Sequence, residues 1–271
     1  MAMIGHEPAG RRMFLAALVG GLAAVPGARA AEPDPWPALA AQIFPDRALL
    51  DGTALLAIDA PYRAEDAAVV PITLRTTLAA DDPRQVRKIT LVIDANPSPL
   101  AATFTPCADA CVDSIATRVR VDDYTNIHAV AELSDGKLYA VARFVKAAGG
   151  CSAPALKRAA DDIALGTIRF RSFPAQDHDR REAQVMVRHP NYSGMQMDQI
   201  THLYIPADFL QTMRIWQGDQ LLLAVESGIS ISENPAFRFS FKSNDARTMR
   251  VEVADSEGRH FTGSFPAEST A

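Results

Sequence analysis

Long apolar runs, basic stripes and cysteines are all scarce in this chain of 271 residues. The apolar run that ends at Ala24 falls short of the roughly 18 residues that a membrane-spanning helix needs, and no later run reaches that length. No basic stretch with interleaved aromatic residues is present, which argues against nucleic acid and anionic lipid as partners. With a formal net charge of −5, the chain is expected to be a mildly acidic soluble protein without a membrane span.

Residues 1–30 have the pattern of an export signal. The paired Arg11 and Arg12 precede Phe-Leu and the apolar run, and Ala28-Arg29-Ala30 supplies a small-x-small cleavage pattern. The arginine pair resembles a twin-arginine address, although an ordinary secretory signal can carry two arginines as well. We therefore predict export to the periplasm, with the twin-arginine route favoured.

The three cysteines are an odd number for an exported protein, in which an oxidising compartment tends to pair them. Cys107 and Cys111 lie four positions apart between two predicted strands and are the candidate disulfide pair. The same spacing also fits two free thiols or two soft metal ligands, but no histidine or further cysteine close in sequence completes a metal site. No metal is therefore assigned, and Cys151 is left unpaired.

Cys151 directly follows Gly149 and Gly150, at the end of a predicted strand. Glycine adopts either sign of φ, so this pair predicts a flexible arm that carries the thiol as a tethered nucleophile. The alternative is a Gly-Gly turn beside a buried structural cysteine. Lys146 and Lys157 flank the segment, and their charge would favour the thiolate. The more common role of lysines beside a linker is that of solvated surface residues.

Alternating apolar residues and β-branched runs predict an all-β protein with two β-sandwiches in tandem. One short helix is expected over Pro37–Phe44, and a polar linker over 156–166 separates residues 31–155 from residues 167–271. Paired acidic residues such as Asp122-Asp123 adjoin turns and are interpreted as solvated. The strands expected before the linker are Val69–Thr76, Lys88–Asp94, Ala101–Thr105, Ala116–Val121, Asn126–Leu133 and Leu138–Lys146. Those expected after it are Thr167–Phe173, Ala183–Arg188, His202–Ile205, Met213–Trp216, Gln220–Val225, Ala236–Lys242, Thr248–Val253 and His260–Phe265.

Short motifs in both halves recur in the order and spacing of a known pair of proteins. Those in the first half are Ala64-Glu65-Asp66, Val70-Pro71-Ile72, Asp94-Ala95-Asn96-Pro97-Ser98-Pro99, Thr117-Arg118-Val119-Arg120, Asp135-Gly136-Lys137-Leu138-Tyr139 and Gly149-Gly150-Cys151. Those in the second half are His189-Pro190, Gly194, Asp198, Ile205-Pro206, Gly218, Ile231-Ser232, Asn234-Pro235, Asp255 and Gly258. The first half thus resembles SoxY and the second SoxZ, the subunits of the periplasmic thiosulfate-oxidation carrier. Their fusion in one chain resembles the SoxYZ-like carriers associated with quinoprotein dehydrogenases.

This resemblance implies two immunoglobulin-like sandwiches that pack on each other and a covalent attachment site for sulfur species at Cys151. It implies a carrier without turnover of its own and without a cofactor, whose partners are periplasmic redox or hydrolase enzymes of a Sox-like pathway or a quinoprotein dehydrogenase system. The chain departs from the family where Ser152-Ala153-Pro154 replaces two terminal glycines and a second domain follows. The arm is then a loop anchored at both ends, with a shorter reach than a free tail.

Two other functions stay open at this point. A periplasmic copper-binding or other metal-binding module would use thiolate, thioether and imidazole ligands. The residues available to it are Cys107, Cys111, His189, Met195, Met197 and His202. A non-catalytic docking scaffold for a dehydrogenase would leave Cys151 without a role.

Overall fold

The structure is a computed structural model that describes residues 34–79, 81–108, 112–154, 163–177 and 180–268. The predicted export signal, Cys111 and Lys157 lie outside these ranges. None of the described helices is long and apolar enough to cross a membrane.

The predicted N-terminal helix is confirmed as α1 (Trp36–Ile43). Pro37 stands in its first turn, where a missing backbone N–H does no harm. The Trp36 ring stacks on the ring of His128, with centroids 3.6 Å apart and planes 4° from parallel. His128 in turn lies 2.9 Å from the Asp94 carboxylate. This stack fixes the helix against the strand that contains His128.

Almost all other regular structure is β, as the alternation predicts. The strands of the first half are β1 (Leu49–Asp51), β2 (Leu56–Asp59), β3 (Val70–Thr76), β4 (Val86–Ile93), β5 (Leu100–Pro106), β6 (Ser114–Val119), β7 (Thr125–Leu133) and β8 (Leu138–Val145). Those of the second half are β9 (Ile168–Asp177), β10 (Arg180–Val187), β11 (Leu210–Gln217), β12 (Gln220–Ser227), β13 (Ala236–Lys242), β14 (Thr248–Asp255) and β15 (His260–Pro266). The sequence did not reveal β1 and β2, because three or four residues are too few to show a period.

The predicted strand His202–Ile205 is wrong. These residues belong to the long loop between β10 and β11, where the bridge between Met197 and Tyr204 is isolated. His202 has a φ of 56°, which no regular strand allows. Ile200 and Leu203 are 79% and 68% exposed. The alternation is present, but no neighbouring strand or core buries its apolar face.

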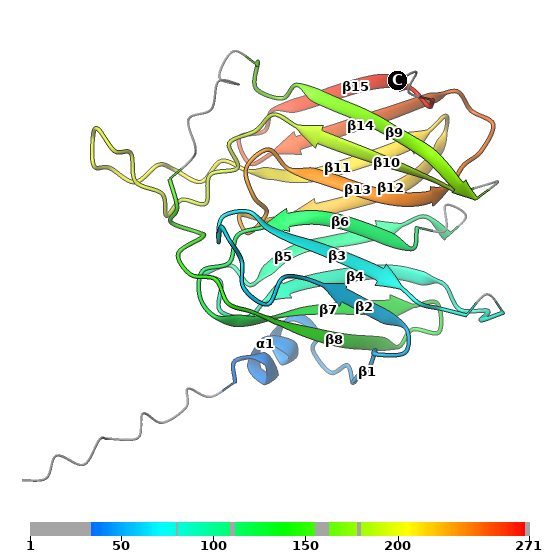
Figure 1. Cartoon of the computed structure of the whole chain (residues 1–271), viewed down its shortest axis with the longest axis horizontal. Coiled ribbons are helices and arrows are strands. Elements are labelled where there is room, and N and C mark those ends of the chain that lie inside the picture. The colour runs from blue at the N-terminus through cyan, green and yellow to red at the C-terminus, as the bar shows by residue number, and fades with distance from the viewer. Residues whose placement is uncertain (1–33, 80, 109–111, 155–162, 178–179, 269–271) are drawn as a thin grey trace, which may run out of the picture. The chain divides into compact units, whose positions relative to one another are not determined.

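The strands form two sheets that both run through the two halves of the chain (Figure 1). The order in the nine-stranded sheet is β1-β8-β7-β4-β5-β12-β11-β14-β15, and in the six-stranded sheet β2-β3-β6-β13-β10-β9. One joint is the antiparallel pair β5 and β12, in which Phe104 faces Val225. The other joint is β6 and β13, in which Ile115 faces Phe239. Edge strands that would otherwise be open thus pair with each other.

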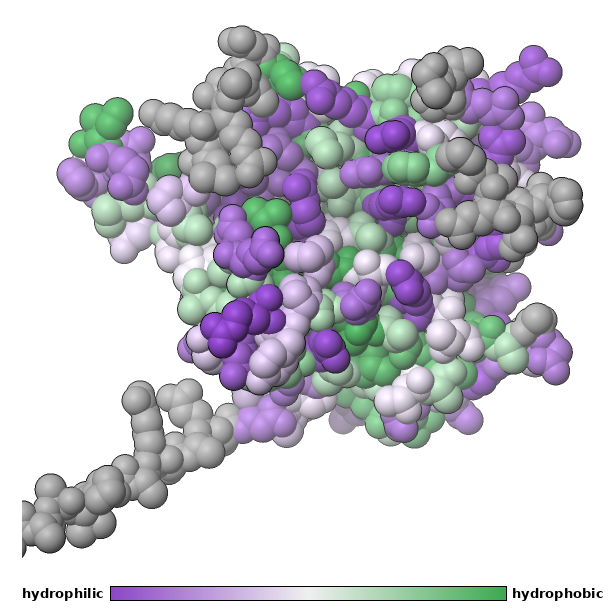
Figure 2. Space-filling model, viewed as in Figure 1, coloured by the Kyte–Doolittle hydropathy of each residue, from purple (hydrophilic) through white to green (hydrophobic). Residues whose placement is uncertain are grey.

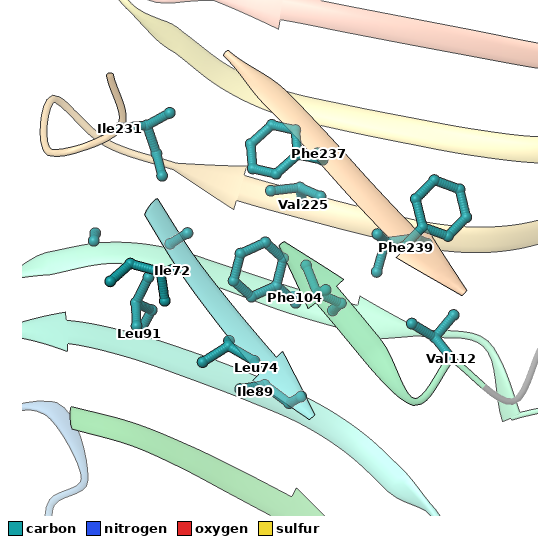
Figure 3. Packing of buried hydrophobic residues seen from close by; sticks show 14 of the residues in the cluster. Ile72, Leu74, Ile89, Leu91, Phe104, Val112, Val225, Ile231, Phe237 and Phe239 are labelled. Carbon is teal, nitrogen blue, oxygen red and sulfur yellow. The ribbon is translucent and has the colours of Figure 1, made fainter. Parts of the chain in front are cut away.

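The hydrophobic core is continuous across the joint as well (Figure 3). Phe104 of the first half meets Phe237 of the second edge to face, with ring centroids 6.0 Å apart, and both rings are buried. Ile72 and Leu91 extend the core on one side of this contact. The all-β prediction is confirmed, and the halves pack by sharing sheets and core. The division into domains at 156–166 remains a prediction from sequence.

Candidate functional site

Cys151 lies in the segment that follows β8, and backbone hydrogen bonds hold this segment against the residues after β6. The Gly149 N–H donates to the Asp122 carbonyl at 2.8 Å, and the Gly150 N–H donates to the Val121 carbonyl at 3.0 Å. The Cys151 N–H donates to Asp122 Oδ1 at 3.3 Å. The cysteine is therefore part of a turn that is docked on the first half.

Glycine is required at positions 149 and 150 for two different structural reasons. Gly149 has a φ of +76°, in the left-handed region, and an added Cβ would meet nothing within 4 Å. At Gly150 an added Cβ would lie 2.1 Å from the Ala67 carbonyl oxygen and 2.6 Å from that of Val121. Gly149 makes the turn, and Gly150 allows close approach of two backbones. Flexibility of this arm stays a prediction, because the structure shows the packed form.

The second half of the chain holds the other side of this segment. Ser193 Oγ donates to the Cys151 carbonyl at 2.5 Å, and Gln196 Nε2 donates to the Ala153 carbonyl at 2.9 Å. The Gln196 side chain also accepts a bond from the Ser193 N–H at 3.1 Å, which fixes the two residues together. Cys151 thus lies at the joint, with groups from both halves around it.

Arg120 lies beside the cysteine and is only 1% exposed. Its Nη1 donates to the Gly150 carbonyl at 3.3 Å, and its Nη2 donates to the Asn191 carbonyl at 3.4 Å. Its backbone is fixed at both ends, since the N–H donates to the Ser230 carbonyl at 2.7 Å and the C=O accepts from Asn96 Nδ2 at 2.8 Å. Arg120 Nε is buried without a hydrogen-bond partner in the described part of the chain.

The Cys151 thiol is 1% exposed, whereas the sequence led us to expect a reachable sulfur. Burial, together with the negative charge and hydrogen bond of Asp122, raises the pKa of Cys151 from 9.0 to about 12, against the opposing effect of Arg120. The closed thiol is therefore protonated at neutral pH. Its immediate neighbours are nevertheless polar, which distinguishes this site from a cysteine packed in hydrocarbon.

The charges that act on Cys151 are not those expected from the sequence. The Lys146 ammonium lies over the rings of Tyr62 and Tyr124, 5.0 and 6.0 Å from their centroids. Asp122, interpreted as solvated, is half-buried and binds Cys151, while Asp123 is exposed. Strand alternation would place Arg120 on the outer face next to the buried Val119, so no local pattern indicated that a later loop covers it.

The other predicted site residues lie elsewhere. Cys107 is half-buried with a free thiol, and because Cys111 lies outside the described residues, their disulfide stays a prediction. His189, Asp208 and Asp255 form a cluster whose ligand-type atoms lie within 4.8 Å of one another. Arg259 already pairs with both carboxylates, at 2.5 Å to Asp208 and 2.6 Å to Asp255.

The histidine of this cluster is also held on both sides. Its Nδ1 accepts the Asn191 N–H at 3.1 Å, and its Nε2 lies 3.4 Å from Asp208 and 3.5 Å from Asp255. Burial lowers the pKa of His189 against the opposing effect of the two carboxylates. The cluster has the character of a closed structural network. Met197, one of the two methionines considered as copper ligands, lies on the exposed loop between β10 and β11.

Two family models match this chain. The family model for sulfur oxidation protein SoxY matches residues 40–151, so that its last residue is Cys151. The family model for sulphur oxidation protein SoxZ matches residues 168–266. A search among curated proteins gives no match.

Solved structures share only part of the chain. A superoxide reductase (neelaredoxin) from Ignicoccus hospitalis has a TM-score of 0.31 and 10% identity over 34% of this chain and 78% of its own. A putative superoxide reductase from Thermotoga maritima has a TM-score of 0.31 and 14% identity over 37% of this chain and 92% of its own. Similarity this low supports no functional conclusion. The two family matches, in this order and with immunoglobulin-like sandwiches in both halves, show that the chain belongs to the SoxYZ family of sulfur-oxidation carriers, with SoxY and SoxZ fused in one polypeptide.

Proposed function

We propose that this protein is a covalent carrier that holds a sulfur-containing intermediate on Cys151 and presents it to partner enzymes. The observation that supports this most is the position of Cys151, where the SoxY match ends and where both halves of the fusion meet. A carrier needs a reactive group that other proteins can reach at defined times. It needs no turnover and no cofactor of its own.

Transfer requires the loop to open, because the thiol is buried in the closed form. The turn is held through its carbonyl groups by Ser193, Gln196 and Arg120, and through the Cys151 N–H by Asp122. The backbone bonds from Gly149 and Gly150 to the residues after β6 hold it as well. A partner that binds the open form better than the closed form shifts the population toward it. In the open form the thiol regains water, so its pKa falls toward the usual range and the thiolate becomes available.

The surface beside the loop suits contact with such a partner. The loop between β10 and β11, which supplies Ser193 and Gln196, extends to a tip at the upper left of Figure 2, where apolar and hydrophilic side chains are mixed. Ile200, Leu203 and Tyr204 in this loop are 79%, 68% and 67% exposed. Exposed apolar groups of this kind mark interaction sites. An enzyme that docks here would contact the same segment that holds the cysteine closed.

Cellular location and partners belong to this proposal as well. The pattern of residues 1–30 supports export to the periplasm, and the resemblance supports an enzyme of a Sox-like pathway or a quinoprotein dehydrogenase system as the partner.

Mass spectrometry of the protein purified from its own periplasm tests the carrier role. We expect a mass increment on the peptide that contains Cys151, removed by a thiol reductant and absent from a Cys151→Ser variant. Cys107→Ser is the matched control and should retain the increment. An unmodified Cys151 under conditions in which the cell oxidises sulfur compounds would contradict the proposal.

A further inference from the structure

Arg120 has a buried charge that touches no carboxylate among the described residues, and Glu233 and Asp66 act on it only through their charges. It is among the largest side chains that are fully buried, and it forms no ion pair with a carboxylate among the described residues. Its two hydrogen bonds go to the neutral carbonyl groups of Gly150 and Asn191. A buried cation without a partner is strongly unfavourable, so such a residue calls for a reason beyond packing.

The guanidinium has the donors that an anion would need. Nε has no partner, and both Nη contacts are long, at 3.3 and 3.4 Å. A guanidinium offers parallel N–H donors that match two oxygens of one oxyanion. One of these contacts is to the carbonyl of Gly150, the residue next to Cys151, and the Cys151 side chain is close enough that its charge acts on Arg120. A negatively charged group attached to Cys151 would lie beside these donors.

We propose that Arg120 is an anion-binding residue that holds the charged end of the group on Cys151 while the loop is closed. The ligand class is an S-linked oxyanion, such as a sulfonate joined to the cysteine sulfur. The inference rests on the carrier function and adds how the cargo is retained. The empty thiol has Asp122 as its partner, and the loaded, anionic form has Arg120.

The test uses two adducts of nearly equal shape that differ in charge. In a Cys107→Ser/Cys111→Ser background, Cys151 is alkylated in mild urea either with iodoacetate or with iodoacetamide and returned to buffer. Each reaction forms one S–C bond, releases iodide and transfers the thiol proton to the buffer. The products are an anionic carboxymethyl group and a neutral carbamidomethyl group on the same sulfur.

Urea unfolding at neutral pH then compares the two proteins. We expect the unfolding equilibrium constant of the carboxymethyl protein to be about tenfold smaller than that of the carbamidomethyl protein, because a charged hydrogen bond to Arg120 stabilises only the anion. In Arg120→Gln this preference should vanish or reverse, since Asp122 then repels the anion. Arg120→Lys, which retains the positive charge but not the parallel N–H donors of the guanidinium, should keep part of the preference for the anionic adduct.

Two outcomes would overturn the inference. One is equal stability of the two adducts in the otherwise unchanged protein, a result that does not depend on whether an Arg120 variant folds. The other is a preference for the anion that survives in Arg120→Gln. Neither outcome concerns the presence of a natural adduct on Cys151, so the carrier role and this inference can fail separately.

Discussion

Two of the polar clusters among the described residues each contain one arginine, and the surroundings of these two arginines differ. Arg259 in the second half pairs with Asp208 and Asp255, next to the buried His189. Arg120 at the joint has two neutral carbonyl groups and one donor without a partner. The first cluster is satisfied by its own residues. The second leaves one donor of a buried guanidinium without a partner among the described residues, beside the cysteine that we propose as the attachment site.

The largest expected effect is on stability when Arg259 is replaced. Arg259→Gln removes the guanidinium from the carboxylate of Asp255, which is 2% exposed and keeps only its backbone N–H donors and the contact with His189. We expect a loss of about 3 kcal/mol, at the lower end for a broken buried pair because the Arg259 side chain is partly exposed. Arg120→Gln removes a charge that forms no ion pair among the described residues, and the loss should be about 1 kcal/mol or less. Urea unfolding at pH 7 measures both, and equal losses would remove the distinction between the clusters.

Acid provides a control for the Arg259 result. Burial acts to raise the pKa of Asp255, but hydrogen bonds and charge from Arg259 outweigh it, and the net shift is downward. A lowered pKa in the folded state contributes stability that is present above the unfolded value of about 3.9 and is lost as the pH falls through the folded value. The difference between the parent and Arg259→Gln should therefore shrink below about pH 4.

The next effect concerns the two glycines of the Cys151 turn. Gly150→Ala drives a methyl group against two backbone carbonyls, so we expect the turn to be displaced at a cost of about 2 kcal/mol. In Gly149→Ala the added methyl group contacts no atom, and only the strain of a left-handed φ remains, which costs about 1 kcal/mol of stability. Alkylation of Cys151 by iodoacetamide should accelerate more in Gly150→Ala than in Gly149→Ala. The reverse order would show that close packing does not hold the turn shut.

A third effect is expected in alkaline solution. Because the pKa of Cys151 is raised to about 12 by burial and Asp122, the folded protein keeps a proton that the unfolded chain releases above about pH 9. Stability should therefore decline by about 1.4 kcal/mol for each pH unit between these two values. Cys151→Ser should lack this decline. Parallel stability curves for the two proteins from pH 8 to 10.5 would mean that the thiol is not buried in solution.

The smallest effect is expected at Ser193. Ser193→Ala removes the hydroxyl that donates to the Cys151 carbonyl, and a hydrogen bond of this kind is worth about 1 kcal/mol. The alkylation rate of Cys151 should then rise about fivefold through easier opening. Ser152→Ala is the matched control, because its exposed hydroxyl bonds only within the turn, to Gly149 at 3.3 Å. Equal alkylation rates of Cys151 in the two variants would show that the hydrogen bond from Ser193 in the second half does not hold the turn closed.

Prediction from sequence succeeded where the signal is local and failed where the contact is distant. Alternation identified β3 to β15 within a few residues at each end, but the same alternation over His202–Ile205 predicted a strand that has no neighbour. The cysteine at position 151 was identified from its glycines. Arg120 and Ser193 surround it from 31 and 42 positions away. Arg120 belongs to one of the family motifs, but no local pattern connects either residue with Cys151.

The sequence by itself determined the all-β class, the terminal position of the cysteine after the first half and the SoxY-then-SoxZ order, because side-chain period and motif spacing are properties of neighbouring residues. Only the tertiary structure decided that the halves share two sheets and that the thiol is shut between Asp122 and Arg120. Strand pairing and burial depend on which segments meet in space, and the pKa of a thiol depends on burial more than on the residues beside it in the chain.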